Sequence, residues 1–207
     1  GFPLFQRSNK GVTLTPDGER IVPVLRDMMR CEEQLYQVSS EIRGVIVGDI
    51  TIGSYFSIAA SWLPGVICRF QKDYPNVEIQ IIEGGTDIME GAMERREADL
   101  CLYAGGEGKN FEWLPLCEDQ MLALVPPGHP LAEGAFVPLE SFLAEPFIMP
   151  MQGYDGEVHD ILSNLPQQPH ILFSACSDYA IISMVAKGLG VPILADLLLR
   201  NYPNDAV

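Results

Sequence analysis

The sequence predicts an α/β protein of two small lobes, preceded by a short β-hairpin and a long helix. Three observations support this class. Residues 45–103 alternate β-branched strands with helical segments, residues 147–194 repeat that alternation, and a Pro/Gly cluster at residues 126–130 separates them. Such alternation is typical of mostly parallel sheets covered on both faces. We therefore expect two lobes hinged about a cleft.

The first element expected is a hairpin over residues 4–15, with a turn at residues 8–11 between two short extended runs. A helix should follow, because Thr15 is a good N-cap and Pro16 suits the first helical position. The acidic Asp17 and Glu19 would lie in its first turn, where the helix dipole favours negative charge.

This helix carries an apolar repeat whose members are spaced alternately by three and four residues. The seven residues, named the seam below, are Ile21, Val24, Met28, Cys31, Leu35, Val38 and Ile42. The stripe is narrow and has charged residues between its members, which favours a dimerising helix. Packing of the helix on its own domain is the alternative. Pro23 should bend the helix near its start, and Gly44 should end it.

The later elements follow from β-branched runs and from helical periodicity. Strands are expected at 45–53, 77–83, 98–103, within 116–125, and at 147–151, 171–175 and 191–194; helices are expected at 58–74, 87–96, 155–164 and 177–187. Ligands in open α/β sheets bind beyond the carboxyl ends of the strands, near helix N-termini. The cleft should therefore lie at those ends.

Charge divides the chain unequally. The net charge is −15, yet residues 1–30 hold five basic and three acidic residues, so this segment is at +2 and the remainder at −17. Because nucleic-acid affinity depends on Lys and Arg neutralising phosphates, only the N-terminal segment is suited to DNA. No apolar run approaches the roughly 20 residues of a membrane span, and no secretion signal begins the chain, so we expect a cytoplasmic protein.

The sequence contains no pattern typical of a metal or catalytic centre. Five cysteines form no Cys-x-x-Cys pair, and the three histidines lie far apart. Neither a phosphate loop ending in Gly-Lys-Ser/Thr nor a Gly-x-Ser-x-Gly elbow is present. We expect reduced thiols, no metal, no cofactor and no enzymatic activity.

Several short motifs, in order along the chain, give it a family likeness. They are Pro3-Leu4-Phe5-Gln6-Arg7, Leu14-Thr15-Pro16-Asp17-Gly18, Ile52-Gly53, Leu63-Pro64, Phe70, Tyr74-Pro75, Ala98-Asp99-Leu100, Gly128-His129-Pro130-Leu131, Pro146-Phe147-Ile148 and Val185-Ala186-Lys187-Gly188-Leu189-Gly190-Val191. In this order they resemble a LysR-type transcriptional regulator over essentially the whole chain. Ala195 departs from the family, which usually has proline there.

The resemblance implies a periplasmic-binding-protein-like effector domain behind a linker helix and the wing of a winged helix-turn-helix. The implied divisions are a wing at 1–15, a linker helix at 16–44, effector lobe I at 45–125 and effector lobe II at 126–207. The recognition helix and the chain's return to lobe I are expected outside this sequence. In the intact regulator, Arg7 and Lys10 would contact the DNA backbone, and the seam would assemble a homodimer or homotetramer.

The resemblance also implies a small-molecule effector in the cleft between the lobes. The expected effector-binding residues are Ser54, Tyr55, Ser57, Thr86, Tyr103, Met151, Gln152 and Ser177. Hydroxyl groups beside helix N-termini suit a carboxylate or another anion. The alternative is a purely structural role: the four hydroxyl residues Ser54, Ser57, Thr86 and Ser177 would only cap helices, and Tyr103 would belong to the core.

Three other classes of protein compete with this interpretation. A solute-binding protein of a transporter has similar lobes, but it would not need residues 4–42. An enzyme on a related fold would need a converging acid/base set, which the sequence lacks. A redox sensor would use cysteines in lobe II, where only Cys176 lies well inside the lobe.

Overall fold

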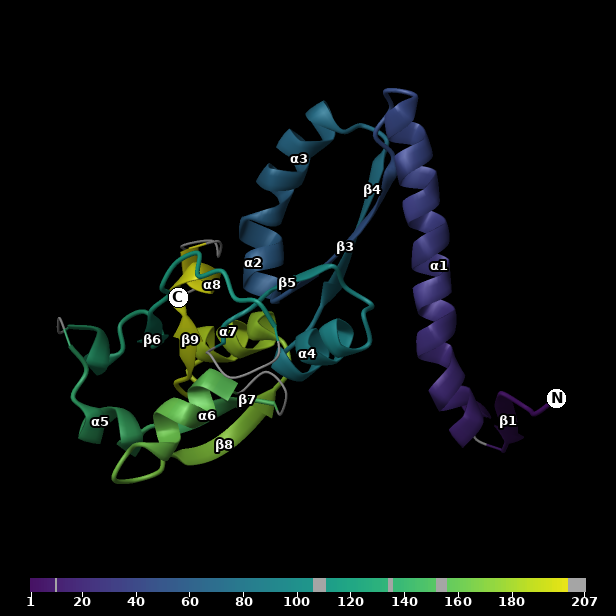
Figure 1. The fold of residues 1–207 in the computed structure, drawn as a ribbon. Coiled ribbons are helices and arrows are strands. Elements are labelled where there is room, and N and C mark those ends of the chain that lie inside the picture. Colours follow the sequence, from purple (N-terminus) through teal and green to yellow (C-terminus); the bar gives the residue numbers. More distant parts are fainter. Residues whose placement is uncertain (10, 106–110, 134–135, 152–155, 201–207) are drawn as a thin grey trace.

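A computed structural model describes residues 1–9, 11–105, 111–133, 136–151 and 156–200. A long helix stands at one side of the molecule, and two groups of strands and helices follow it (Figure 1). Within the described residues, no helix is both long and apolar enough to cross a membrane.

The N-terminal hairpin forms as predicted. Strands β1 (Phe5–Ser8) and β2 (Gly11–Leu14) pair antiparallel. Thr15 then caps α1 (Pro16–Ile42), since its hydroxyl oxygen accepts the Gly18 N–H at 3.0 Å. The same hydroxyl donates to the carbonyl of Pro3 at 2.8 Å, which ties the hairpin to the helix. Pro23 lies inside α1, about two turns from its start, and the helix continues through it to Ile42; a bend at Pro23 stays a prediction.

The seam of α1 is left uncovered. Val24 is 65%, Leu35 69% and Ile42 82% exposed, and Met28 and Val38 are also exposed. The helix is therefore not packed on its own lobe through these residues. Its pairing with a second helix stays a prediction.

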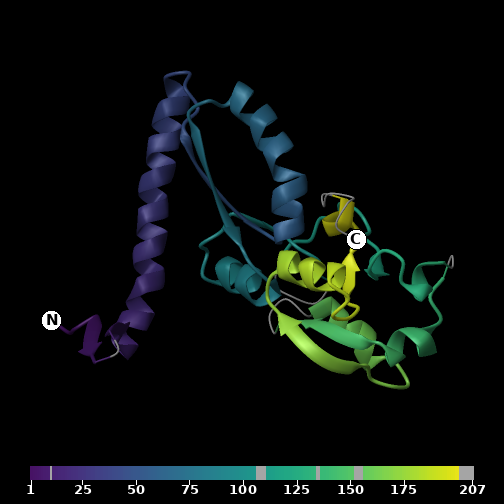
Figure 2. The ribbon, with the colours of Figure 1, turned by 180° about the vertical axis from the view of Figure 1, so that it is seen from behind.

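The first lobe is built on a parallel sheet of order β4–β3–β5, with β3 Gly48–Ser54, β4 Val77–Glu83 and β5 Leu100–Leu102. Helices α2 (Phe56–Ser61), α3 (Leu63–Asp73) and α4 (Thr86–Glu94) connect the strands. Both views place α1 and α3 on opposite sides of β3 and β4 (Figures 1 and 2).

One predicted helix is two helices in the structure. A single helix was expected at 58–74, but α2 ends at Ser61 and α3 begins at Leu63, with Trp62 between them. Pro64 explains the break, because proline has no N–H for the backbone bond of a continuous helix and is best accommodated in a first turn.

The second lobe contains two strand pairs. Strand β6 (Met121–Ala123) runs antiparallel to β9 (Ile193–Ala195), and β7 (Pro146–Pro150) runs parallel to β8 (His170–Ala175). A bridge between Phe147 and Val191 joins the pairs. The surrounding helices are a 3-10 turn η1 (Pro130–Glu133), α5 (Leu139–Ala144), α6 (Gly156–Ser163), α7 (Asp178–Ala186) and α8 (Asp196–Arg200).

The pairing of β6 differs from the expected division of the lobes. We expected residues 45–125 to belong to lobe I, with the crossing at 126–130. Instead β6 pairs with β9, and the Leu124 N–H donates to the carbonyl of Pro192 at 3.1 Å. This pairing joins Met121–Ala123 to a strand near the C-terminus, and the exact division of the chain into lobes stays a prediction.

The tightest core lies in the second lobe, where Phe147, Ile148, Ile181, Ile182 and Val185 are fully buried. Helix α7 supplies three of these residues, which lie on one side of the helix. Strand β7 supplies the other two.

Candidate functional site

The carboxyl ends of the first-lobe strands meet at one point. The Tyr55 N–H, just after β3, donates to the carbonyl of Leu102 in β5 at 3.0 Å. On the other side, the Gly84 N–H after β4 donates to the carbonyl of Ser54 at 3.3 Å. These bonds hold the ends of three strands together, as expected for a binding site on an open α/β sheet.

Tyr55 reaches from this point to the second lobe. Its hydroxyl donates to Glu157 Oε1 of α6 at 2.9 Å and also hydrogen-bonds Thr86 Oγ1 of α4. A phenol has one proton, so the Thr86 hydroxyl is the donor to the Tyr55 oxygen. The three side chains therefore form a chain of hydrogen bonds that closes the two lobes on each other.

The environment keeps this donor protonated. Burial raises the pKa of Tyr55 above its ordinary value, the Thr86 hydrogen bond opposes this, and the Glu157 carboxylate raises it again. The charged form is disfavoured both by the loss of water and by the neighbouring negative charge. At neutral pH, Tyr55 thus keeps the O–H that it donates to Glu157.

Two further aromatic rings extend from Tyr55. The ring of Tyr103, beyond β5, lies 6.0 Å from that of Tyr55 and 4.9 Å from that of Trp113. Burial raises the pKa of Tyr103. The indole N–H of Trp113 is buried and has no partner among the residues that the structure describes. Tyr103 thus lies between the rings of Tyr55 and Trp113, and its contact with an effector stays a prediction.

The predicted hydroxyl groups differ in what they do. Ser54 is fully buried, and its hydroxyl donates to the carbonyl of Tyr55 at 3.0 Å, so it is used within the strand end. Ser57 lies partly buried in α2 and makes no cap. Gly85, not Thr86, is the N-cap of α4, which leaves the Thr86 hydroxyl to Tyr55. The capping interpretation of Thr86 is therefore wrong.

The second-lobe residues lie at the matching strand ends. The Met151 N–H, after β7, donates to the carbonyl of Ala175 at 2.9 Å, and Met151 is exposed. Ser177 is the N-cap residue of α7, but its side chain makes no cap bond. No described contact brings either residue to Tyr55. Gln152 lies outside the described residues, and effector contact by this set remains a prediction.

Glu157 is the residue that sequence reasoning missed. An acidic residue in a first helical turn is ordinarily explained by the helix dipole, and the expected helix at 155–164 provided that explanation. The available signal was Gly156, the first residue of α6. A Cβ there would lie 4.0 Å from Thr86 Oγ1, so the first turns of α4 and α6 face each other closely.

Of the two residues predicted to contact DNA, the structure describes only Arg7. Arg7 lies exposed in β1, at the far end of α1 from the first sheet (Figure 1). Lys10 lies outside the described residues. Contact of both with DNA remains a prediction.

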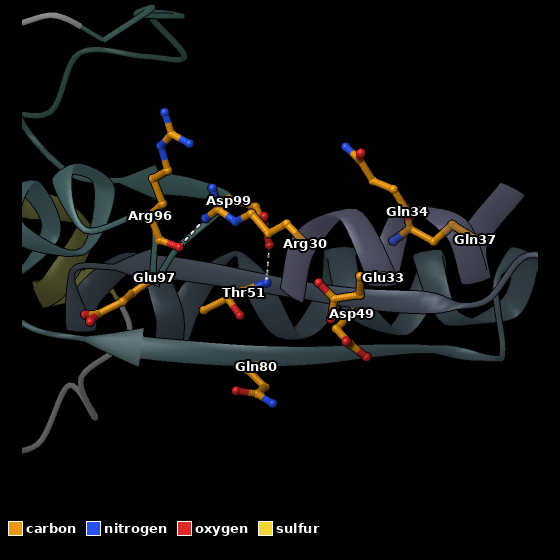
Figure 3. A pocket seen from close by; sticks show the side chains of 10 residues that line it. All are labelled: Arg30, Glu33, Gln34, Gln37, Asp49, Thr51, Gln80, Arg96, Glu97 and Asp99. Atoms are coloured by element: carbon orange, nitrogen blue, oxygen red, sulfur yellow. Dashed lines mark hydrogen bonds between the residues drawn. The ribbon is translucent and has the colours of Figure 1, made fainter. Parts of the chain in front are cut away.

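A polar hollow lies between α1 and the first sheet (Figure 3). Its volume is about 360 Å³, and charged side chains from α1, β3 and the segment before β5 line it. Here Glu33 of α1 faces Asp49 of β3. The hydrogen bond to Asp49 is the main cause that raises the pKa of Glu33, followed by burial and by repulsion from Asp49 and Asp99.

This carboxyl pair makes the contact pH-dependent. A raised pKa means that the contact favours protonated Glu33, so its stabilisation is full at low pH and is lost as pH rises through the raised value. Glu33→Gln should therefore raise Tm by about 1–3 °C at about pH 7.5, and bring no gain near pH ~4. Calorimetry at both pH values checks this, with Glu32→Gln, one residue along the helix, as control. Equal shifts at both pH values would contradict it.

The described residues contain no group of three His, Cys, Asp or Glu side chains that could hold a metal ion. All five cysteines are free, and Cys176 is exposed. Among the described residues, the site therefore contains neither a group of metal ligands nor a disulfide.

The family described as LysR substrate binding domain matches residues 43–207. The HTH-type transcriptional regulator IlvY of Escherichia coli is 31% identical over 215 residues, covering 99% of this chain and 70% of IlvY. The structure of HinK, a LysR family transcriptional regulator from Pseudomonas aeruginosa, matches with a TM-score of 0.64 and 30% identity, over 93% of this chain and 64% of HinK.

A third match concerns a single domain. The CcmR regulatory domain of Synechocystis PCC6803, solved in complex with 2-PG, has a TM-score of 0.70 at 19% identity, over 76% of this chain and 77% of that domain. At this identity the match supports the fold alone. The chain spans about two thirds of the length of the regulators it matches. The predicted fold class is confirmed: a two-lobed, periplasmic-binding-protein-like α/β domain behind a long helix.

Proposed function

Because its residues 43–207 match the LysR substrate-binding domain, this chain belongs to the LysR-type family of transcriptional regulators, and we propose that its cleft senses a small-molecule effector. The observation that carries the proposal is the hydrogen-bond chain through Tyr55, Thr86 and Glu157, which spans the two lobes at the strand ends. An effector that enters there must change these bonds, and so the angle between the lobes.

The chemistry of the cleft favours an acidic effector. The first turns of α4 and α6 face each other, and helix N-termini attract anions. Glu157 already places a carboxylate on the Tyr55 hydroxyl. A small acid would take over that position, and Glu157 would move away with the second lobe. Ser57, beside Tyr55 at the start of α2, would add a hydroxyl.

Sensing requires that the effector bind one arrangement of the lobes more tightly than the other. With Glu157 on Tyr55, the acceptor position is taken and the lobes are held together. With an acid in its place, that bond between the lobes is lost. The effector would therefore favour the arrangement in which Glu157 is released.

The intact regulator would pass this change to promoter DNA. We propose that the seam pairs two copies of α1, giving a homodimer that forms the unit of a homotetramer. The wing residues Arg7 and Lys10 would then contact the DNA backbone in the cytoplasm, although the remainder of this acidic chain is unsuited to DNA. The effector would therefore change the arrangement of the subunits on DNA, and no reaction would be catalysed.

Solute binding for a transporter was the alternative. The two-lobed fold is compatible with it, but no feature of the described residues favours it over regulation, and the relatives that cover nearly the whole chain are named as regulators. The hairpin and α1 also have a place only in the regulator.

A thermal-shift screen of small organic acids tests the proposal. A ligand at about 100 times its Kd should stabilise the chain by about 2.7 kcal/mol, or roughly 5–10 °C in Tm. Thr86→Val and Ser57→Ala should each weaken the binding of a hit by about tenfold, because a hydroxyl contact to a charged ligand is lost.

The matched control is Ser183→Ala, whose hydroxyl only bonds the carbonyl of Tyr179 within α7. It should leave the shift unchanged. Glu157→Gln should strengthen the binding of an acid, because a competing negative charge is removed. A hit that keeps its full shift in the Ser57 and Thr86 variants would contradict the assignment of the cleft.

A further inference from the structure

Helix α4 has its two ends in two different places. Its first residue, Thr86, bonds Tyr55 in the cleft and lies against the first turn of α6. The turn that ends it, at residues 95–97, lies against α1. Because an α-helix rises about 1.5 Å per residue, these nine residues join the two places over roughly 13 Å.

The turn that ends α4 has an unusual residue. The Arg96 N–H donates to the carbonyl of Met93 at 3.0 Å, and the Glu97 N–H donates to that of Ala92 at 2.7 Å. These two bonds form a Schellman motif, whose left-handed position is ordinarily glycine. Here the position is Arg96 at φ 54, and it alone among the described non-glycine residues has a positive φ. The strained position therefore retains a side chain that glycine lacks.

That side chain binds α1. Arg96 Nη1 lies 2.6 Å from Asp27 Oδ1, and the carbonyl of Arg96 accepts a hydrogen bond from the Arg30 guanidinium (Figure 3). The carbonyls at a helix C-terminus carry partial negative charge, so they favour a cation here. The strained residue thus contacts α1 through both its side chain and its backbone.

Arg26 supplies a second set of bonds one turn earlier on α1. Its guanidinium lies 2.8 Å from Glu97 Oε1 and donates to the carbonyl of Arg95 at 3.3 Å. Helical spacing of about 100° per residue places Arg26 and Arg30 on the face of α1 opposite the seam. One face of α1 therefore holds the end of α4, while the other stays open for a second helix.

The middle of α4 is held differently from its ends. Met89 and Ala92 are 0% and 1% exposed, and a Cβ on Gly53 of β3 would lie 2.9 Å from Met89 Sδ. The middle of α4 is thus fixed by close apolar packing. Its two ends are held by hydrogen bonds and ion pairs, which can break and form with other partners. A helix held in this way tilts about its middle when one end is displaced.

We propose that α4 is the lever that couples the effector cleft to the linker helix, with the Arg96 turn as its grip on α1. The proposal rests on the proposed function, since the effector is what displaces Thr86. When Thr86 moves, the turn at residues 95–97 moves in the opposite sense and changes the direction of α1. The geometry of the paired seams then changes with it.

Amide hydrogen exchange of the whole chain, without effector or DNA, tests the lever. Tyr55→Phe removes the bonds at the cleft end of α4 and is expected to speed exchange in residues 26–33 of α1 by about fivefold. Arg96→Gly and Asp27→Asn each remove the ion pair between Arg96 and Asp27, which is the side-chain part of the grip, so each should also speed exchange there. Arg96→Gly should do so without lowering Tm, because glycine suits the left-handed position.

The control substitution is Ser183→Ala, whose hydroxyl bonds the carbonyl of Tyr179 within α7 and makes no described bond to α4. It should leave exchange in residues 26–33 unchanged. If Tyr55→Phe also leaves it unchanged while Arg96→Gly speeds it, α4 does not couple the two ends. If Arg96→Gly has no effect either, the grip does not hold α1. Either failure is distinct from failure of effector sensing, which the thermal-shift screen reads separately.

Discussion

Replacing Met28 and Leu35 together with glutamate is expected to convert a dimer of this chain into a monomer. Both residues belong to the seam and are 65% and 69% exposed. A paired seam would bury four carboxylates without counter-charges. Since about 2.8 kcal/mol corresponds to a hundredfold change in Kd, the dimer should weaken by at least about 100-fold. Sedimentation velocity at micromolar concentrations measures this directly.

The same helix offers a matched control one residue along. Met29 and Tyr36 have the same spacing and are 65% and 64% exposed, but they lie off the seam. Met29→Glu with Tyr36→Glu adds the same charge to α1 and should leave the dimer intact. Equal dissociation of the two variants would show that charge on α1, not the seam, controls assembly. A wild-type chain that sediments only as a monomer would rule out the paired seam.

Adding one methyl group at Gly190 is expected to destabilise the second lobe strongly. A Cβ there would lie 2.5 Å from the carbonyl oxygen of Pro146, which already accepts the Val191 N–H at 2.8 Å. The backbone of β7 would have to shift, and Phe147 and Ile148 beside it are fully buried. Gly190→Ala should therefore cost about 3 kcal/mol and lower Tm by roughly 6–12 °C.

Gly65→Ala makes the contrasting case. Gly65 lies in α3, and a Cβ there meets nothing within 4 Å. Because glycine weakens a helix interior, this substitution should stabilise the chain by about 0.5–1 kcal/mol. Thermal unfolding of the two variants under one condition compares them. A Gly190 variant that melts like the wild type would mean that β7 and the segment before Val191 are more loosely packed than described.

Elements that depend on neighbouring residues were predictable. The hairpin, the Thr15 cap and the seam follow from turn chemistry, side-chain bonds three residues apart and helical spacing. The helix expected at 58–74 was wrong in one respect, although its cause was already in the sequence at Pro64. The pairing of Met121–Ala123 with β9 was not predictable, because three residues carry no information about a partner such as Ile193, which lies 70 positions from Ala123.

The candidate site was only half predictable. Tyr55 and Thr86 could be placed together because parallel strands end at one edge of a sheet. Glu157 could not, since its partner Tyr55 is 102 positions away and a first-turn carboxylate already has a local explanation. Arg96 carries no local signal at all: its left-handed backbone is known only from the structure.

The sequence by itself determined the order of strands and helices, the family, and the apolar seam, because periodicity and short motifs depend on local spacing. Tertiary structure decided which distant polar groups meet: Tyr55 with Glu157, and Arg26 and Arg96 with their partners across the gap between α1 and α4. The physical reason is that an exposed charged side chain has many possible partners of similar energy. Only the packing of the lobes brings one of them within bonding distance.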